Sequence, residues 1–209
     1  MRALLVTGGH DHDISFYSVL DGQDDLEVWV DPHPNAFVTA SLEGTDVVVL
    51  YDMLAAMTPD QRESLRAFVE AGGGVVALHH AIAGRTGWRW WWEEVVGGRY
   101  LTEPAEGRPA STYKHDEELQ VTVAATHPVT SGVTTFRIVD ETYKGMWISP
   151  DVTVLLTTDN PTSDGPVAWI GPHPKARVVF VQLGHGREAH LHPAFRRLVR
   201  NAVLWAAGR

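Results

Sequence analysis

The sequence predicts an α/β fold: a three-layer sandwich in which helices cover both faces of a mostly parallel central sheet. Four short aliphatic runs, at residues 3–6, 47–50, 75–78 and 178–181, have the unbroken apolar character typical of strands that are covered on both faces. Strands alternate with helical segments over the first eighty residues, which is typical of parallel βαβ units. With 209 residues and 44% hydrophobic content, the chain is expected to form one domain over residues 1–209.

The first elements follow from local signals. After the first strand, Asp13 is a suitable N-cap for a helix that would place Ile14, Tyr17 and Leu20 on its buried face. A second strand is predicted over 26–30, where hydrophobic residues precede a turn rich in proline. The order strand, helix, strand is what a parallel sheet requires.

The helix after the third strand has the strongest signals in the chain. Residues 58–61, Thr-Pro-Asp-Gln, supply an N-cap, a proline at the first helical position and a capping-box glutamine. Leu65, Phe68 and Val69 have the spacing of a buried face, and Gly72 ends the helix. We therefore expect a helix that packs on the sheet between the strands at 47–50 and 75–78.

The regular pattern breaks after the fourth strand and then resumes. Residues 84–112 are predicted to form a lid or insertion, with a short helix over 92–96. Further strands are predicted at 119–123, 136–139, 152–157, 167–170 and 177–182. A closing helix is expected to begin at Pro193, to end at Gly208, and to bury Phe195, Leu198, Val199, Ala202 and Trp205.

Composition excludes several classes of partner and chemistry. The net charge of -9, with 17 Lys and Arg against 26 Asp and Glu, argues against a nucleic-acid partner, which needs a concentrated basic surface. No apolar run approaches the roughly 18 residues of a membrane span, so no membrane partner is expected. The chain has no cysteine, which excludes disulfides, thiolate metal sites and thiol nucleophiles. We expect a cytoplasmic protein.

Polar residues follow all four predicted parallel strands. His10 comes after the first strand, Asp52 after the second of the four, His79 and His80 after the third, and His185 after the last. The carboxyl ends of parallel strands meet at one edge of the sheet, where open α/β folds bind ligands. The sequence therefore predicts an active site at this edge.

The eleven histidines suggest metal or proton chemistry. His10, His12, His79 and His80 are candidate ligands of a divalent metal such as zinc; a three-histidine site with an open water position would suit hydrolysis or carbonyl polarisation. The alternative is that the His10–His12 pair is only a turn element, since no HExxH-type spacing is present. No nucleotide cofactor is expected.

Other polar and aromatic residues complete the candidate site. Glu141 is predicted to orient a histidine or take a proton, with Tyr143 beside it, and Asp52 either enters the crevice or caps a turn. The four tryptophans within 88–92 have three interpretations. Trp90 can face the crevice and stack on a sugar ring, the block can bury a lid against the sheet, or it can form an oligomer interface.

Several segments together resemble a known family. Residues 72–80 (GGGVVALHH) look like the strand and turn that present the nucleophile in class I glutamine amidotransferase-like domains, and residues 181–185 (VQLGH) are similar to the strand that bears their catalytic histidine. With residues 10–13 (HDHD), 115–119, 127–128, 140–143 (DETY) and 195–205 added, nearly the whole chain resembles the ThuA-like family, named for trehalose utilisation.

The resemblance implies a flavodoxin-like, class I glutamine amidotransferase-like fold and an association with sugar catabolism. It also implies that His185 acts as an acid or base or as a metal ligand, and it adds His115 to the substrate-binding candidates. Histidine stands where the amidotransferases have cysteine, and because a thiolate is needed to attack glutamine, glutaminase activity is excluded.

The expected function is that of an enzyme of trehalose, glycoside or keto-sugar utilisation, with histidine-based or metal-assisted chemistry. Its catalytic residues would be His185, His79 and Glu141. Its substrate would be a small carbohydrate, bound by Asp52, Trp90, Tyr143 and His115. The rival from another class is a non-catalytic sugar-binding or assembly protein on the same fold, and a homo-oligomer is compatible with either.

Overall fold

A computed structural model describes the chain over residues 1–209 except 23–24, 33–35 and 55. Among the described residues, nine strands form the main sheet, in the order β2-β1-β3-β4-β11-β10-β9-β6-β7. Its parallel part contains β2 (Glu27–Pro32), β1 (Arg2–Gly8), β3 (Val47–Asp52), β4 (Gly74–Leu78) and β11 (Val178–Val181). This parallel arrangement of the four apolar runs confirms the prediction.

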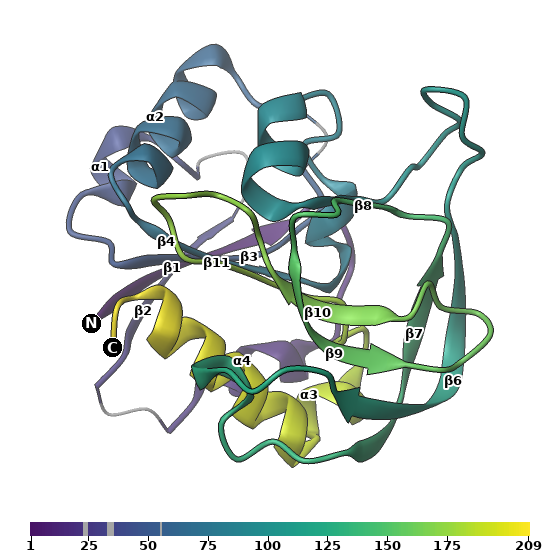
Figure 1. Cartoon of the computed structure of the whole chain (residues 1–209). Coiled ribbons are helices and arrows are strands. Elements are labelled where there is room, and N and C mark those ends of the chain that lie inside the picture. The colour runs from purple at the N-terminus through teal and green to yellow at the C-terminus, as the bar shows by residue number, and fades with distance from the viewer. Residues whose placement is uncertain (23–24, 33–35, 55) are drawn as a thin grey trace.

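Four antiparallel strands extend the sheet beyond β11. They are β10 (Pro166–Ile170), β9 (Thr153–Thr158), β6 (Thr112–Val123) and β7 (Phe136–Lys144). A separate pair is formed by β5 (Gly98–Arg99) and β8 (Trp147–Ile148). Figure 1 shows this extension on the right, where β6 and β7 run steeply across the end of the parallel strands.

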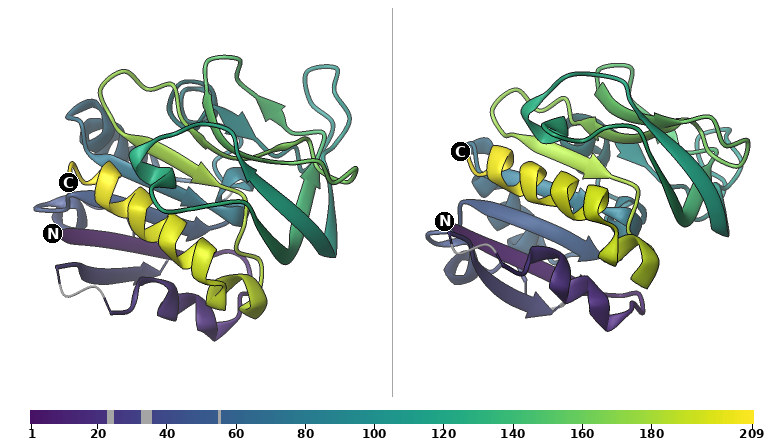
Figure 2. Two further views of the ribbon diagram at one scale, coloured as in Figure 1. Left: turned by 60° about the horizontal axis from the view of Figure 1, so that its bottom comes forward. Right: turned by 90° about the horizontal axis from the view of Figure 1, so that it is seen from below.

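Helices cover both faces of the parallel strands, which gives the predicted three layers (Figures 1 and 2). One face carries α1 (Thr39–Leu42), α2 (Pro59–Glu70) and the π-helix η3 (Trp90–Val96). The other carries the 3₁₀ helix η1 (Ile14–Leu20), α3 (Arg187–Leu191) and α4 (Pro193–Ala206). Short 3₁₀ helices also follow β4, as η2 (His79–Ala83), and precede β7, as η4 (Pro128–Thr130).

Alternation along the central strands divides the core in two. On β3, Val47 and Val49 pack in the cluster that includes α4, whereas Val48 and Leu50 pack in the cluster that includes α2. Successive side chains of a strand point to opposite faces, so a fully apolar strand supplies both clusters. Among the described residues, no helix combines the length and the apolar composition that a membrane span requires.

The helix predicted from residues 58–61 is confirmed as α2. The Thr58 hydroxyl accepts the Gln61 N–H at 3.2 Å, and the Gln61 side-chain oxygen accepts the Thr58 N–H at 3.0 Å, which completes the capping box.

The predicted helix after Asp13 differs in type and in its buried face. Asp13 caps it as expected, by accepting the Ser15 N–H at 2.8 Å. However, it is a 3₁₀ helix that buries Phe16 and Val19, while Ile14 is 79% exposed. Residues three apart share a face of a 3₁₀ helix, so Phe16 and Val19 lie together. Leu20 is buried as predicted, whereas Tyr17 is 41% exposed.

Two strands are longer than predicted. β6 begins at Thr112 rather than at 119, and β7 continues to Lys144 rather than ending at 139. The added residues are mostly polar, so hydrophobic alternation did not mark them as strand. As a result, Glu141 and Tyr143 lie within β7 and not after it.

The tryptophan block is part of the core. Trp88, Trp90, Trp91 and Trp92 are all at most 9% exposed, and η3 begins at Trp90, ahead of the predicted start at 92. The guanidinium of Arg66, on α2, lies 4.2 Å from the Trp90 ring centre. Of the segment 84–112 predicted as a lid or insertion, the exposed residues lie mainly in 102–109, which form the loop projecting at the upper right of Figure 1.

This packing predicts the effect of truncating a buried indole. Trp91→Ala is expected to lower the free energy of unfolding by about 3–5 kcal/mol, because it removes a large, fully buried side chain. Trp29→Ala, at an exposed position on β2, is the matched control and should cost much less. Urea unfolding followed by far-UV circular dichroism measures both; equal costs would contradict the core assignment.

Candidate active site

The site lies at the carboxyl ends of β4 and β11, two adjacent parallel strands. His79 is the first residue after β4 and has a backbone φ of 52°, so the chain makes a sharp left-handed turn there. His185 follows β11 after a short turn. Glu141 and Tyr143 reach the same place from β7, on the antiparallel extension. Segments far apart in sequence thus bring four predicted site residues together.

Two imidazoles and one carboxylate form a compact triangle, which we call the His-Glu cluster: His79, Glu141 and His185. His79 Nε2 lies 2.9 Å from Glu141 Oε2 and 3.1 Å from His185 Nδ1, and His185 Nδ1 lies 2.9 Å from the same carboxylate oxygen. Among the described residues, this is the group of histidine and acidic side chains whose ligand atoms are close enough together to hold a metal ion.

A backbone hydrogen bond sets the orientation of the His79 ring. His79 Nδ1 lies 2.7 Å from the carbonyl oxygen of Gln182, and since a carbonyl oxygen can only accept, Nδ1 donates its proton. The other nitrogen, Nε2, therefore faces Glu141 and His185 with a lone pair when the ring is neutral. Two acceptors at 2.9 Å repel, so the triangle requires a positive charge: a proton on one of its atoms or a metal cation between them.

Asp140, which sequence reasoning passed over in favour of its neighbour, holds the His185 loop. Its carboxylate is buried and accepts the backbone N–H of Gly184 at 2.7 Å and that of His185 at 2.9 Å. Burial raises the pKa of Asp140, although these N–H donors and the nearby His79 act in the opposite direction. Its position directly before Glu141, next to the predicted strand 136–139, was the available signal.

Charge in the cluster is unevenly shared. Burial alone would raise the pKa of Glu141, but the hydrogen bond from His185 and the contact with His79 outweigh burial and hold the pKa at about 2. The same hydrogen bond to Glu141 raises the pKa of His185, against the effect of its partial burial. Glu141 is therefore a carboxylate at neutral pH, and the cluster is suited to holding a positive charge.

Tyr143 and His115 border the cluster. The Tyr143 ring stacks on His79 with centroids 5.3 Å apart, and its hydroxyl lies 3.2 Å from His79 Nε2. Burial, followed by the charges of Glu141 and Asp140, raises the pKa of Tyr143 well above its usual range, so the hydroxyl stays protonated. His115 is half-exposed, with Nδ1 3.9 Å from Glu141 Oε1. His115 therefore borders the cluster on an exposed side, whereas Tyr143 is buried beside it.

The other three metal candidates do not join the His-Glu cluster. His80 stacks on His10, with ring centroids 4.6 Å apart, and His12 contacts the Tyr17 hydroxyl at 3.3 Å. Stacked rings present faces rather than nitrogen lone pairs to one another. Among the described residues, the histidines and acids that meet as a possible metal group include His79 but not His10, His12 or His80, whose role as metal ligands stays a prediction.

Asp52 and Trp90 are placed away from the cluster. Asp52 is fully buried and accepts a hydrogen bond from Arg85 at 2.8 Å, so it holds the segment after η2 rather than facing the crevice. Trp90 packs beside His173, with ring centroids 6.0 Å apart. His173 precedes β11 whereas His185 follows it, so Trp90 lies toward the opposite end of the strands. The substrate roles of these two residues stay predictions.

His190 and His192 have structural roles. His192 caps α4 by accepting the Ala194 N–H at 3.2 Å. His190 is fully buried and contacts the Ser15 hydroxyl at 2.9 Å and the Gly184 carbonyl oxygen at 2.9 Å. Tyr51 donates to the same carbonyl at 2.6 Å. This network ties η1, β3 and α3 to the His185 loop.

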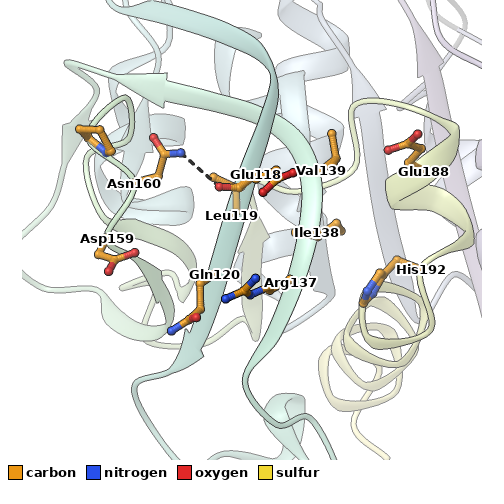
Figure 3. Close-up of a pocket in the computed structure, with 11 residues that line it drawn as sticks. Glu118, Leu119, Gln120, Arg137, Ile138, Val139, Asp159, Asn160, Glu188 and His192 are labelled. Atoms are coloured by element: carbon orange, nitrogen blue, oxygen red, sulfur yellow. Dashed lines mark hydrogen bonds between the residues drawn. The ribbon is translucent and has the colours of Figure 1, made fainter.

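A groove of about 690 Å³ lies across β6, β7 and α3 (Figure 3). Its lining combines apolar and polar residues, and the charged or ionisable ones are Glu118, Arg137, Asp159, Glu188 and His192. Two of its lining residues adjoin the cluster in sequence: Val139 precedes Glu141 by two positions, and Glu188 follows His185 by three. Its volume is in the range of small-molecule sites. None of the predicted site residues is among those that line it.

Comparison with models of protein families assigns the chain to a family. The family model for ThuA, described as "Trehalose utilisation", matches residues 2–206. The chain belongs to the ThuA family. The sequence has no significant match among curated proteins.

Several solved structures share the fold of this chain. A putative ThuA-like protein from Parabacteroides merdae is 20% identical, with a TM-score of 0.82 over 100% of this chain and 90% of that one. A putative ThuA-like protein from Bacteroides uniformis is 21% identical, with a TM-score of 0.76 over 99% and 91%. A putative GMP synthase protein from Thermoplasma acidophilum is 14% identical, with a TM-score of 0.59 over 99% and 94%. The class I glutamine amidotransferase-like fold is thereby confirmed.

The buried His80 ring predicts how stability depends on pH. Burial, followed by the charges of His79 and His10, lowers the pKa of His80 to about 2, so the unfolded chain binds a proton there below pH 6.5 that the folded chain does not. The folded state therefore loses stability as the pH falls, by about 1.4 kcal/mol per pH unit well below 6.5.

Substituting His80 isolates this effect. The free energy of unfolding of His80→Leu is expected to fall less steeply than that of the wild type between pH 7 and pH 5, since the variant has no imidazole to protonate. Urea titrations at several pH values measure both slopes. Parallel slopes would show that His80 is not kept neutral in the folded state.

Proposed function

We propose that the protein is an enzyme of sugar utilisation whose catalytic centre is the His-Glu cluster, and that this centre works with a divalent metal ion. One observation carries the proposal: His79 Nδ1 donates to the Gln182 carbonyl, which leaves Nε2 directed at the Glu141 carboxylate 2.9 Å away. A cation at this point satisfies all three groups of the cluster at once.

The donor set fits a metal of the zinc type. Two histidines and one carboxylate are the ligands of several catalytic zinc sites, which keep a further position open for water or substrate. Ligand atoms of a tetrahedral zinc site lie about 3.3 Å apart, given bonds of about 2.05 Å. The separations of 2.9, 2.9 and 3.1 Å in the cluster are slightly shorter, so small side-chain shifts would accommodate the ion.

The surrounding contacts also suit metal binding. The hydrogen bond from His79 Nδ1 to a backbone carbonyl is the arrangement that fixes the orientation of metal-binding histidines. Bound there, a divalent cation would polarise a carbonyl or activate a water molecule. Glu141 and the two histidines would hold it, and the Tyr143 hydroxyl, which keeps its proton, would donate a hydrogen bond to a substrate oxygen.

The substrate class follows from the family and from the accessibility of the site. The family is described by trehalose utilisation, and we propose that a trehalose-like glycoside or its keto form is the substrate. The outer side of the site is formed by His185 and His115, whose side chains are 32% and 47% exposed. A ligand can therefore reach the cluster past these two rings. A cytoplasmic location is part of the proposal.

Histidine acid/base chemistry without metal is the second candidate. The raised pKa of His185 favours it, because a protonated imidazole at neutral pH can act as a general acid. A non-catalytic sugar-binding protein is the remaining alternative. The three interpretations differ in metal content, in turnover and in ligand affinity, which can be measured separately.

The test compares wild type, His79→Gln, Glu141→Gln and His185→Gln with His127→Gln, a control at a histidine that caps η4. Elemental analysis of the purified proteins is expected to find one divalent metal ion per chain in wild type and control, and little in the three cluster variants. Turnover of trehalose and its 3-keto form should fall by roughly 10²–10⁴-fold in these variants.

Two outcomes would redirect the proposal. A metal-free wild type whose turnover depends on His185 would support acid/base chemistry alone. A metal-free wild type with no turnover, and with unchanged sugar affinity in all variants, would support a binding protein. Metal-dependent activity should also fall at acidic pH, because protonated imidazole does not bind metal.

A further inference from the structure

Tyr113, a residue not included among the predicted site residues, projects from the face of the sheet that carries the His-Glu cluster. It is directly opposite Tyr143 in the pairing of β6 with β7, and directly opposed residues lie on the same face. Tyr143 stacks on His79, so this is the cluster's side of the sheet. The side chain of Tyr113 is nevertheless largely open to solvent, since the residue is 59% exposed.

A row of rings connects Tyr113 to the cluster. The ring centroids of Tyr113 and His115 are 5.0 Å apart, those of His115 and His185 are 4.6 Å apart, and those of His185 and His79 are 5.2 Å apart. Exposure increases along this row, from the buried His79 to the open Tyr113. The row therefore forms one side of the approach to the cluster.

Polar atoms accompany the outer rings of the row. Tyr113 carries a hydroxyl at its edge, and His115 has ring nitrogens, of which Nδ1 lies 3.9 Å from Glu141 Oε1. An exposed aromatic ring with hydrogen-bonding groups at its edge is suited to a ligand that has both an apolar face and hydroxyl groups. A pyranose ring has both.

We propose that Tyr113 and His115 form a stacking platform for the outer ring of a substrate that contains at least two sugar rings. The inference rests on the proposed function, in which the cluster acts on a sugar. Tyr113 lies one ring further out than His115, which itself contacts His185. A glycoside whose reacting unit lies at the cluster would extend its second unit over Tyr113, whereas a monosaccharide would not reach it.

The experiment measures binding of trehalose, maltose and glucose, and of their 3-keto forms, by titration calorimetry to wild type, Tyr113→Ala and Tyr113→Phe. Trp29→Ala is the control, because Trp29 is a similarly exposed aromatic on β2, at the other side of the sheet. Tyr113→Ala should weaken binding of the preferred disaccharide about tenfold, as loss of one aromatic stacking contact implies. Glucose affinity should not change, and Tyr113→Phe and Trp29→Ala should match wild type.

The outcomes separate the platform from the proposed function. If wild type binds a disaccharide and Tyr113→Ala binds it equally well, the platform is overturned while the proposed function stands. If Tyr113→Ala loses glucose and disaccharide affinity to the same degree, the ring contacts the reacting unit, and the two-ring inference is overturned. If wild type binds none of these sugars or their 3-keto forms, the proposed function fails and the platform with it. Unchanged melting temperatures confirm that the variants are folded.

Discussion

The hydrogen bond from His79 Nδ1 to the Gln182 carbonyl is the contact on which the site depends. It joins the ends of two neighbouring parallel strands, and it decides which imidazole nitrogen carries the proton. With Nδ1 occupied, Nε2 can only face Glu141 and His185. The backbone turn at His79, with its positive φ, places the ring within reach of that carbonyl. Fold geometry and protonation state are therefore set by one interaction.

The antiparallel extension makes a buried polar centre tolerable. Burying a carboxylate costs free energy unless the carboxylate is paired. Here β7 supplies two: one faces the histidines, and the other binds the loop that contains His185. Asp140 receives the backbone N–H groups of Gly184 and His185, while Glu141 faces the two rings. Adjacent residues of one strand point to opposite faces, so a single dipeptide fixes the loop from one side and completes the cluster from the other.

The parallel sheet and the convergence of its polar ends could be predicted because strong local signals marked them. Apolar runs mark buried strands, and the residues after them must meet at one edge, which is why His79 and His185 were expected together. The capping box of α2 could be predicted from residues 58–61 in the same way. Other features could not be predicted because tertiary contacts decide them. Such contacts decide that residues 14–20 form a 3₁₀ helix and that β7 continues to Lys144. They also decide the position of Trp90, which packs against Arg66 and His173. The stacking of His80 on His10 likewise left no sequence signal.

β6 contains one extra residue between Lys114 and Glu117, because these pair with Thr142 and Asp140 on β7. Asp116, with a φ of 57°, lies in this bulge. The bulge changes which face each residue occupies, so that Tyr113 and His115 lie toward the cluster while Leu119 and Val121 enter the core. The bulge therefore separates residues of β6 that can be substituted freely from residues that the core constrains. Residues before the bulge can change with the ligand under no packing constraint from the core, whereas deletion of a single residue there would turn the apolar half of the strand to solvent.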